Sequence, residues 1–160
     1  MIAVKLGIVL LLAGIAFQDY TRREVYAFVF PLLALLMGYV HYTDVSMLNF
    51  LTAVGINIIM VLTILLVLWS YAYFRIKKPF FREVLGLGDV FYFLCLAVGF
   101  PTVSFTILFV FSILFTALAW LILKPKAIQP TVPLAGGMAL FTGIFLLGAW
   151  STNTLNLYLI

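Results

Sequence analysis

The sequence predicts an all-α membrane protein: a single domain, residues 1–160, with six transmembrane helices and both termini on the non-cytoplasmic side. The chain of 160 residues is 66% hydrophobic and 9% charged, whereas soluble domains are about 45–50% apolar and about 25% charged. Its mean hydropathy is +1.27. Six spans of about 20 residues each would fill most of this length and leave no room for a separate soluble domain.

The first half of the chain contains three apolar runs that end at charged residues. They extend from Ile2 to Gln18, from Val25 to Thr43 and from Val45 to Phe74, and Lys5 is the only charge inside them. Each run is close to or above the length that crosses a bilayer. Each therefore predicts one helix.

The next apolar stretch, from Val90 to Leu123, is too long for a single span. At a rise of 1.5 Å per residue it would far exceed the roughly 30 Å of bilayer hydrocarbon. Gly99 and Pro101 supply a break near its first third. We expect a hairpin of two helices, Val84–Gly99 and Val103–Leu123.

The last run follows a proline-containing loop, Gln129–Pro133, and predicts a helix from Leu134 to Trp150. We expect the polar tail that follows, Ser151–Asn156, to lie at the interface. The start of the chain, Met1–Ala16, also resembles a signal peptide. Because two arginines follow the first apolar run, export of that flank is disfavoured, and we expect the segment to be retained as a helix.

Basic residues set the predicted orientation, because Lys and Arg concentrate in short cytoplasmic loops. All 9 except Lys5 fall in alternate loops: Arg22, Arg23; Arg75, Lys77, Lys78, Arg82; Lys124, Lys126. Lys5 can snorkel at the end of its helix. These loops are therefore predicted to be cytoplasmic, in a multi-pass protein of the inner (plasma) membrane.

The remaining composition narrows the function classes. Cys95 is the only cysteine, which excludes an internal disulfide, and with His41 the only histidine we expect no metal and no other cofactor. The net charge of +4 is too dispersed for a nucleic-acid partner, whereas contact with lipid headgroups is expected. Cys95 is expected to pack in the core, and Asn57 to form an interhelical hydrogen bond. His41 is placed in an outer interface belt with Tyr39 and Tyr42.

Two of the 5 acidic residues stand out by their surroundings. Asp44, Glu24 and Glu83 suit ordinary surface positions. Asp19 and Asp89 instead border apolar helices, and an acid within a membrane segment costs about 2.5–3.5 kcal/mol on insertion scales. Such residues are functional candidates by default.

The predicted topology places Asp19 and Asp89 at the same membrane level. Two neighbouring carboxyls cannot easily both ionise, so they share a proton and titrate as a unit. Such a pair can activate water while its protonated member polarises a carbonyl, which is the chemistry of aspartic proteolysis. The alternative is structural: Asp19 pairs with Arg22 or Arg23, and Asp89 caps a helix.

The sequence Gly86-Leu87-Gly88-Asp89, at the start of a helix and after a basic loop, resembles the GxGD membrane aspartyl proteases, and among them the type IV prepilin peptidases. Asp19, with Arg23 behind it, matches the first aspartate of that family. Val25 stands where Ile is usual, and Tyr26 and Ala27 depart from the Pro-Asn that follows in the family. Val132–Gly136 looks like the family's proline-containing element before the last helix.

The resemblance implies an aspartic endopeptidase that removes the basic leader from prepilin-like or preflagellin-like proteins at the cytoplasmic face. It implies that Asp19 and Asp89 are catalytic. An N-terminal segment with paired cysteines, which accompanies methyltransferase activity in longer members, does not occur here. The chain therefore looks like a minimal form, and no methyltransferase activity is expected.

Three further residues are expected to contact the substrate. Gly86 and Gly88 allow positive φ and close backbone approach, so that a substrate segment can lie beside Asp89. Pro133 belongs to the proline-containing element. The oligomeric state does not follow from the sequence.

Two other functions fit the same acids. A presenilin-like intramembrane protease also carries a GLGD sequence and a proline–leucine element, although its first aspartate does not lie in the first helix. A small transporter or proton-conducting protein, which is not an enzyme, would use the acids as ion sites, although the chain lacks the inverted repeat frequent in transporters.

Overall fold

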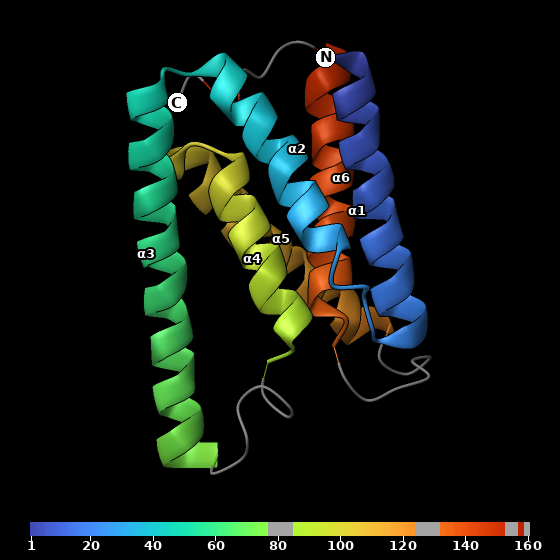
Figure 1. Cartoon of the computed structure of the whole chain (residues 1–160). Coiled ribbons are helices and arrows are strands. Elements are labelled where there is room, and N and C mark those ends of the chain that lie inside the picture. The colour runs from blue at the N-terminus through green and yellow to red at the C-terminus, as the bar shows by residue number, and fades with distance from the viewer. Residues whose placement is uncertain (77–84, 124–131, 153–156, 159–160) are drawn as a thin grey trace.

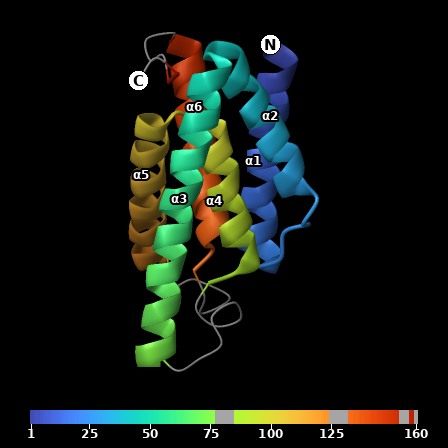
Figure 2. The same ribbon diagram turned by 60° about the vertical axis from the view of Figure 1, so that its left-hand side comes forward.

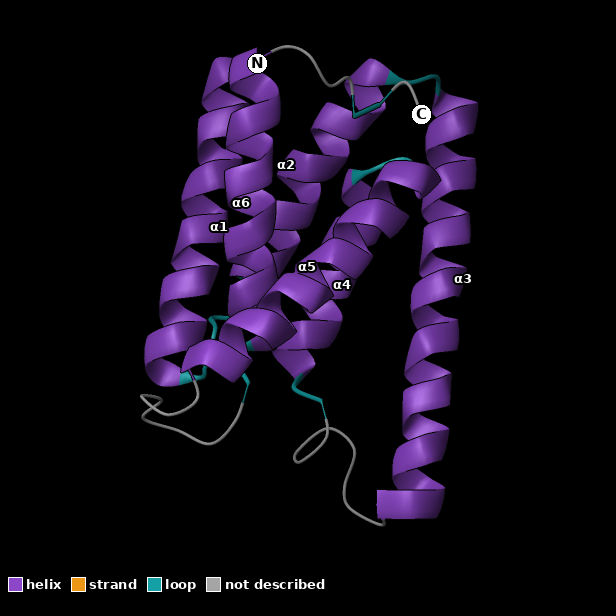
Figure 3. Cartoon of the chain, turned by 180° about the vertical axis from the view of Figure 1, so that it is seen from behind, coloured by secondary structure: helices purple, strands orange, loops and turns teal. Residues whose placement is uncertain are grey.

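The structure, a computed structural model, describes residues 1–76, 85–123, 132–152 and 157–158. Within these ranges the regular secondary structure is entirely helical, as Figure 3 shows, which confirms the all-α prediction. The elements are α1 (Ile2–Arg22), α2 (Val29–Asp44), α3 (Met47–Tyr71), the π-helical turn η1 (Ala72–Ile76), α4 (Leu87–Gly99), α5 (Thr102–Leu123) and α6 (Leu134–Thr152).

The predicted helices agree with these bounds except near their ends. Helix α1 extends past Gln18 to Arg22, so that Asp19 lies inside its last turn. Helix α2 begins at Val29 instead of Val25, which places Pro31 in its first turn, where a missing backbone N–H removes no helical hydrogen bond.

Several predicted features lie outside the described residues. They are the start of the fourth helix at Val84, much of the loop before the last helix and most of the polar tail, together with these charged residues: Lys77, Lys78, Arg82, Glu83, Lys124 and Lys126.

The predicted hairpin break is confirmed, and a buried amide stabilises it. Phe100 is extended between α4 and α5, with φ −141° and ψ 150°. Asn57 of α3 is fully buried, and its Nδ2 donates hydrogen bonds to the carbonyl oxygens of Ala97 at 2.9 Å and Phe100 at 2.8 Å. These bonds satisfy carbonyls that the end of a helix leaves without partners. The expected interhelical bond of Asn57 is therefore present.

The helices form a bundle in which α1 packs most extensively on α6 and α2 on α4 (Figure 1). Helix α5 also packs on α6, and α3 lies mainly against α4. The first turn of α1 and the last turn of α6 lie at the same end of the bundle. At the opposite end, α3 extends beyond the other helices in both Figure 1 and Figure 2.

Four helical segments are long and apolar enough to cross a bilayer: Ile2–Arg22, Met47–Arg75, Thr102–Leu123 and Leu134–Ser151. The protein therefore has the character of a membrane protein. Helix α2 has 16 residues and α4 has 13. At 1.5 Å per residue, α4 is about 20 Å long, less than the roughly 30 Å of hydrocarbon.

The predicted interface position of His41 is wrong. Tyr39 and Tyr42 are exposed, but His41 is only 1% exposed, because it lies on the side of α2 that packs on α4. Its Nδ1 lies 2.9 Å from the carbonyl oxygen of Val98. Cys95 is buried in the core, as expected.

Candidate active site

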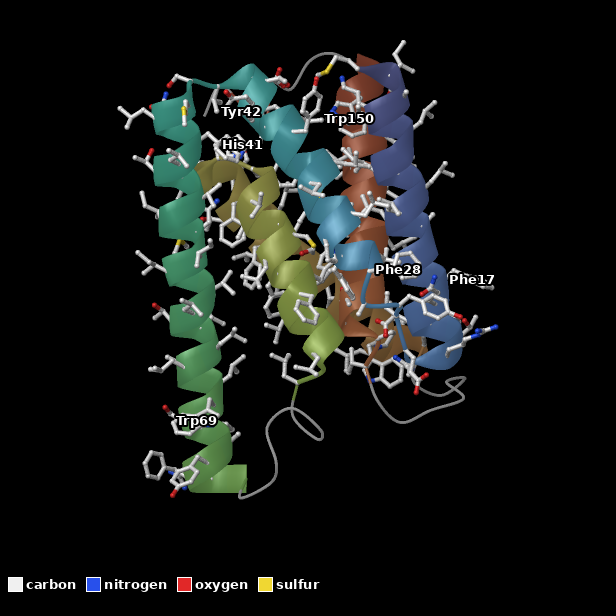
Figure 4. All side chains as sticks on the ribbon, in the orientation of Figure 1. Phe17, Phe28, His41, Tyr42, Trp69 and Trp150 are labelled. Atoms are coloured by element: carbon white, nitrogen blue, oxygen red, sulfur yellow. The ribbon has the colours of Figure 1, made fainter. Side chains whose placement is uncertain are left out.

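Three helix ends meet at the end of the bundle opposite to the chain's N-terminus. They are the C-terminal end of α1, the N-terminal end of α4 and the N-terminal end of α6. Asp19 comes from the first of these ends and Asp89 from the second, and both side chains are half-buried. In Figure 4 this is the end at which Phe17 and Phe28 lie, far from His41 and Tyr42.

The two aspartates bind consecutive backbone amides of α6. Asp19 Oδ2 accepts a hydrogen bond from Gly136 N at 2.6 Å, and Asp89 Oδ1 accepts one from Ala135 N at 2.8 Å. The first N–H groups of a helix have no partner within the helix and carry the positive end of its dipole. The start of α6 therefore holds two carboxyl groups side by side, and they lie close enough to interact electrostatically. Asp19 and Asp89 are called the carboxylate pair below.

Gly136 makes the contact between α1 and α6 possible. A Cβ added to it would lie 2.9 Å from both Cβ and Oδ2 of Asp19, and 3.3 Å from the carbonyl oxygen of Ala16. Even an alanine at this position would have to displace α1. The sequence placed Gly136 only in the proline-containing element before the last helix, and it gave no signal that this glycine accommodates Asp19.

The GxGD glycines differ from expectation in their backbone conformation. Neither Gly86 nor Gly88 has a positive φ; Gly86 is extended, with φ −72° and ψ 147°. Its N–H donates to Asp89 Oδ2 at 3.1 Å, and a Cβ on Gly86 would lie 3.2 Å from the same oxygen. A Cβ on Gly88 would meet the ring of Phe30 at 3.6 Å, an ordinary contact. Gly86 therefore lies against Asp89 itself, whereas the missing side chain of Gly88 faces α2.

Asp89 thus has two roles, one of which is the structural alternative considered from sequence. It caps the start of α4 through Gly86 N, as an N3 acid does in a capping box. Its other oxygen binds Ala135 in α6. Capping alone does not explain the contact with Ala135, because one carboxylate oxygen is enough to cap α4.

Pro133 immediately precedes α6, which begins at Leu134. It is buried, and its carbonyl oxygen accepts a hydrogen bond from Gly137 N at 2.9 Å. Proline suits the start of a helix because its fixed φ is already helical and its missing N–H would have no helical partner. It thereby orients the amides that bind the two aspartates.

Arg23, which the sequence indicated only as a basic loop residue, a motif match and an alternative ion-pair partner of Asp19, also lies at this site. It ends α1 with φ 59° and ψ 18°, in the left-handed region. Its guanidinium carbon lies 5.5 Å from the ring centroid of Trp120 in α5, and its charge acts on Asp19. No ion pair within 4 Å joins Asp19 to Arg22 or Arg23, so the predicted alternative of a direct pair is not what the structure shows.

A hydrogen bond between α4 and α6 lies beneath the pair. Tyr92, one turn after Asp89, donates from its hydroxyl to Thr142 Oγ1 at 3.0 Å, and both side chains are fully buried. This bond joins α4, whose first turn contains Asp89, to α6, whose first turn binds Asp89. In the part of the chain that the structure describes, no group of three histidine, cysteine or acidic side chains could hold a metal ion.

Comparison of the chain with protein-family models, with curated proteins and with solved structures found no match. Functional inference therefore depends on the residues themselves. What they offer is two half-buried carboxyls, held on consecutive amides, at one end of an apolar helical bundle.

Proposed function

We propose that the protein is a membrane aspartic endopeptidase in which Asp19 and Asp89 activate water. The observation that supports this most is the placement of the two carboxyls on the amides of Gly136 and Ala135. Two acids from separate helices have no structural need to share one helix start. Aspartic proteolysis, by contrast, uses two carboxyls that share one proton.

In the proposed reaction the singly ionised pair binds one water molecule next to the scissile carbonyl. The ionised carboxylate takes a proton from water as its oxygen attacks the carbonyl carbon, while the protonated carboxyl donates to the carbonyl oxygen. Breakdown of the tetrahedral intermediate returns a proton to the leaving nitrogen and splits the C–N bond. The amides of Ala135 and Gly136 hold the carboxyls in place throughout, so little reorganisation accompanies the step.

The proposed substrate is a prepilin-like or preflagellin-like protein with a basic leader followed by an apolar helix, as the GxGD resemblance implies. Gly86 is exposed beside Asp89 and leaves room for an extended substrate segment. Gly88 and Pro133 are proposed to border the same segment. Cleavage would leave the apolar helix of the substrate in the membrane.

The proposed topology has six spans in the plasma membrane, with both termini on the non-cytoplasmic side and the carboxylate pair on the cytoplasmic side. The common end of the first turn of α1 and the last turn of α6 supports an even number of crossings. Helices α2 and α4 are short, but in this topology each still counts as one crossing within the bundle. Helix α4 can be short because it begins at the carboxylate pair instead of at the membrane surface.

Replacing each aspartate by asparagine tests the proposal. Asp19→Asn and Asp89→Asn should each abolish leader removal, followed as a mobility shift of a prepilin-like substrate co-expressed in the same membranes. Asp44→Asn is the matched control, since Asp44 is an exposed acid at the other end of α2, and should cleave normally. Each variant must be recovered from the membrane fraction at the wild-type level.

Normal cleavage by either variant would show that the pair is not catalytic. The non-enzymatic alternative predicts a different pattern: vesicles with the wild-type protein would take up protons or a solute, the same substitutions would stop that flux, and no substrate would be cleaved.

A further inference from the structure

Arg23 combines two features that do not favour the folded state. Its φ of 59° lies in a region that residues other than glycine and asparagine rarely adopt. Its Nη1 is buried and has no hydrogen-bond partner among the residues that the structure describes, which leaves a charged donor without compensation there. A glycine or an asparagine would suit this backbone better and would bury no charge. Stability therefore does not explain an arginine at this position.

The side chain is nevertheless held in a defined place. Its guanidinium group lies over the ring of Trp120, with 5.5 Å from Cζ to the ring centroid, a distance at which a cation and an aromatic face attract each other. Its backbone N–H donates to the carbonyl oxygen of Asp19 at 3.3 Å. Arg23 is thus tied to α5 by its side chain and to α1 by its main chain.

Few other charges face Asp19 from the elements around it. Helices α5 and α6 contain no charged residue, and α4 contributes only Asp89. The charged or titratable residues of α2 are at its far end: Tyr39, His41, Tyr42 and Asp44. Arg22 and Glu24 are exposed beside Arg23. Of these groups, the ones that act on Asp19 or interact with it are Arg23 and Asp89.

We propose that Arg23 is a positioning residue whose charge, oriented by Trp120, favours the singly ionised carboxylate pair that activates water. This inference rests on the proposed peptidase function. Because Nη1 has no acceptor within the described ranges, no described partner neutralises the guanidinium charge. In a partly buried setting such a charge acts more strongly than at the surface.

The proposal gives a signed prediction for pH dependence. A pair that works singly ionised gives a bell-shaped pH profile. A nearby cation favours each loss of a proton, so its removal makes both limbs of the profile move to higher pH. The expected displacement is about one pH unit, the lower end of the effect of an arginine near an aspartate. On the acidic limb, cleavage should fall roughly tenfold, and on the basic limb it should rise.

The experiment measures kcat/KM against pH for the purified full chain, with a peptide that carries a basic leader and an apolar segment. Arg23→Asn and Arg23→Gly remove the charge with residues that tolerate φ 59°, so the backbone is not disturbed. Arg23→Lys keeps a cation and should retain most of the wild-type profile. Arg22→Asn is the matched control: it removes the neighbouring exposed arginine and should leave the profile in place.

Trp120→Ala provides an independent variant if the substitutions at Arg23 lower recovery from the membrane. It should shift both limbs in the same direction by less, because the cation remains but is no longer oriented by the ring.

A uniform loss of activity at every pH, or an unchanged profile in Arg23→Asn and Arg23→Gly, would overturn the role of Arg23. An equal shift in Arg22→Asn would overturn it too, because an effect of general surface charge or of membrane orientation would act through either arginine. The peptidase proposal itself would remain in each case, since its own test is the loss of cleavage in Asp19→Asn and Asp89→Asn.

Discussion

At each end of α4 a side chain binds backbone groups that lack a helical partner, but at one end it is a hydrogen-bond donor and at the other an acceptor. At its C-terminal end, Asn57 donates two hydrogen bonds to orphan carbonyls and is fully buried. At its N-terminal end, Asp89 accepts hydrogen bonds from two amides and is only half-buried. A neutral, buried amide such as Asn57 is sufficient to stabilise a helix end. The acidic, half-open arrangement is the one that the proposed reaction requires.

The comparison extends to the helices that supply the partners. Asn57 connects α3 to the chain segment between α4 and α5. Asp89 instead binds the start of α6, which Asp19 from α1 also binds. Polar groups at the first end should therefore affect stability, and those at the second should affect activity. Each substitution below tests that division.

The largest effect is expected from Gly136→Ala. The added methyl group would meet Asp19 Cβ and Oδ2 at 2.9 Å, so α1 must shift and the bond from Gly136 N to Asp19 is lost. Because a misplacement of about 1 Å can cost about a hundredfold in rate, cleavage should fall by at least that factor. The measurement is the single-turnover cleavage rate.

Gly148→Ala on the same helix is its control, since a Cβ there would meet no atom of the described residues within 4 Å. Equal activity of Gly136→Ala and Gly148→Ala would contradict the tight contact between α1 and α6.

Asn57→Leu should have the largest effect on stability. It leaves the carbonyls of Ala97 and Phe100 without donors in the core, at a cost of about 1–3 kcal/mol for an unsatisfied buried group. The melting temperature in detergent should fall, while cleavage by the folded fraction should stay within about twofold of the wild-type rate.

Asn49→Leu, an exposed position on the same helix, should leave the melting temperature unchanged. A specific loss of activity in Asn57→Leu, with no change in melting, would contradict the proposed division between the two ends.

Tyr92→Phe should give the smallest effect. It removes one buried hydrogen bond to Thr142, worth about 0.5–1.5 kcal/mol, and leaves the ring in the core. We expect a small decrease in melting temperature and a modest decrease in cleavage, because Tyr92 lies one turn from Asp89. Tyr42→Phe, at an exposed tyrosine, should change neither quantity.

The sequence anticipated where helices begin and end better than which side of each helix is buried. Charged residues and the Gly99–Pro101 break fixed the helix limits to within a few residues, because crossing a bilayer demands long apolar runs. The rotation of a helix about its axis leaves no such signal, since lipid and core both accept apolar side chains. His41 was therefore misplaced.

The candidate site was predictable in part, because the bilayer also restricts where charged residues occur. Acids are costly in a membrane, so Asp19 and Asp89 were evident from the sequence, and the alternation of basic loops placed them at one level. Their shared support on α6 was not, because it depends on two backbone amides. The left-handed conformation of Arg23 was not predicted either, since no pattern in its neighbourhood indicates one.

The most direct test of the central claim is a double-mutant comparison of Asp19→Asn, Asp89→Asn and the combined variant. If the two carboxyls act as one unit, each single variant should lose as much activity as the double variant, as residues of one catalytic unit do. The measurement is the single-turnover cleavage rate of a prepilin-like substrate by the purified protein. We predict three equal rates at background. A single variant that retains clearly more activity than the double variant would contradict the account.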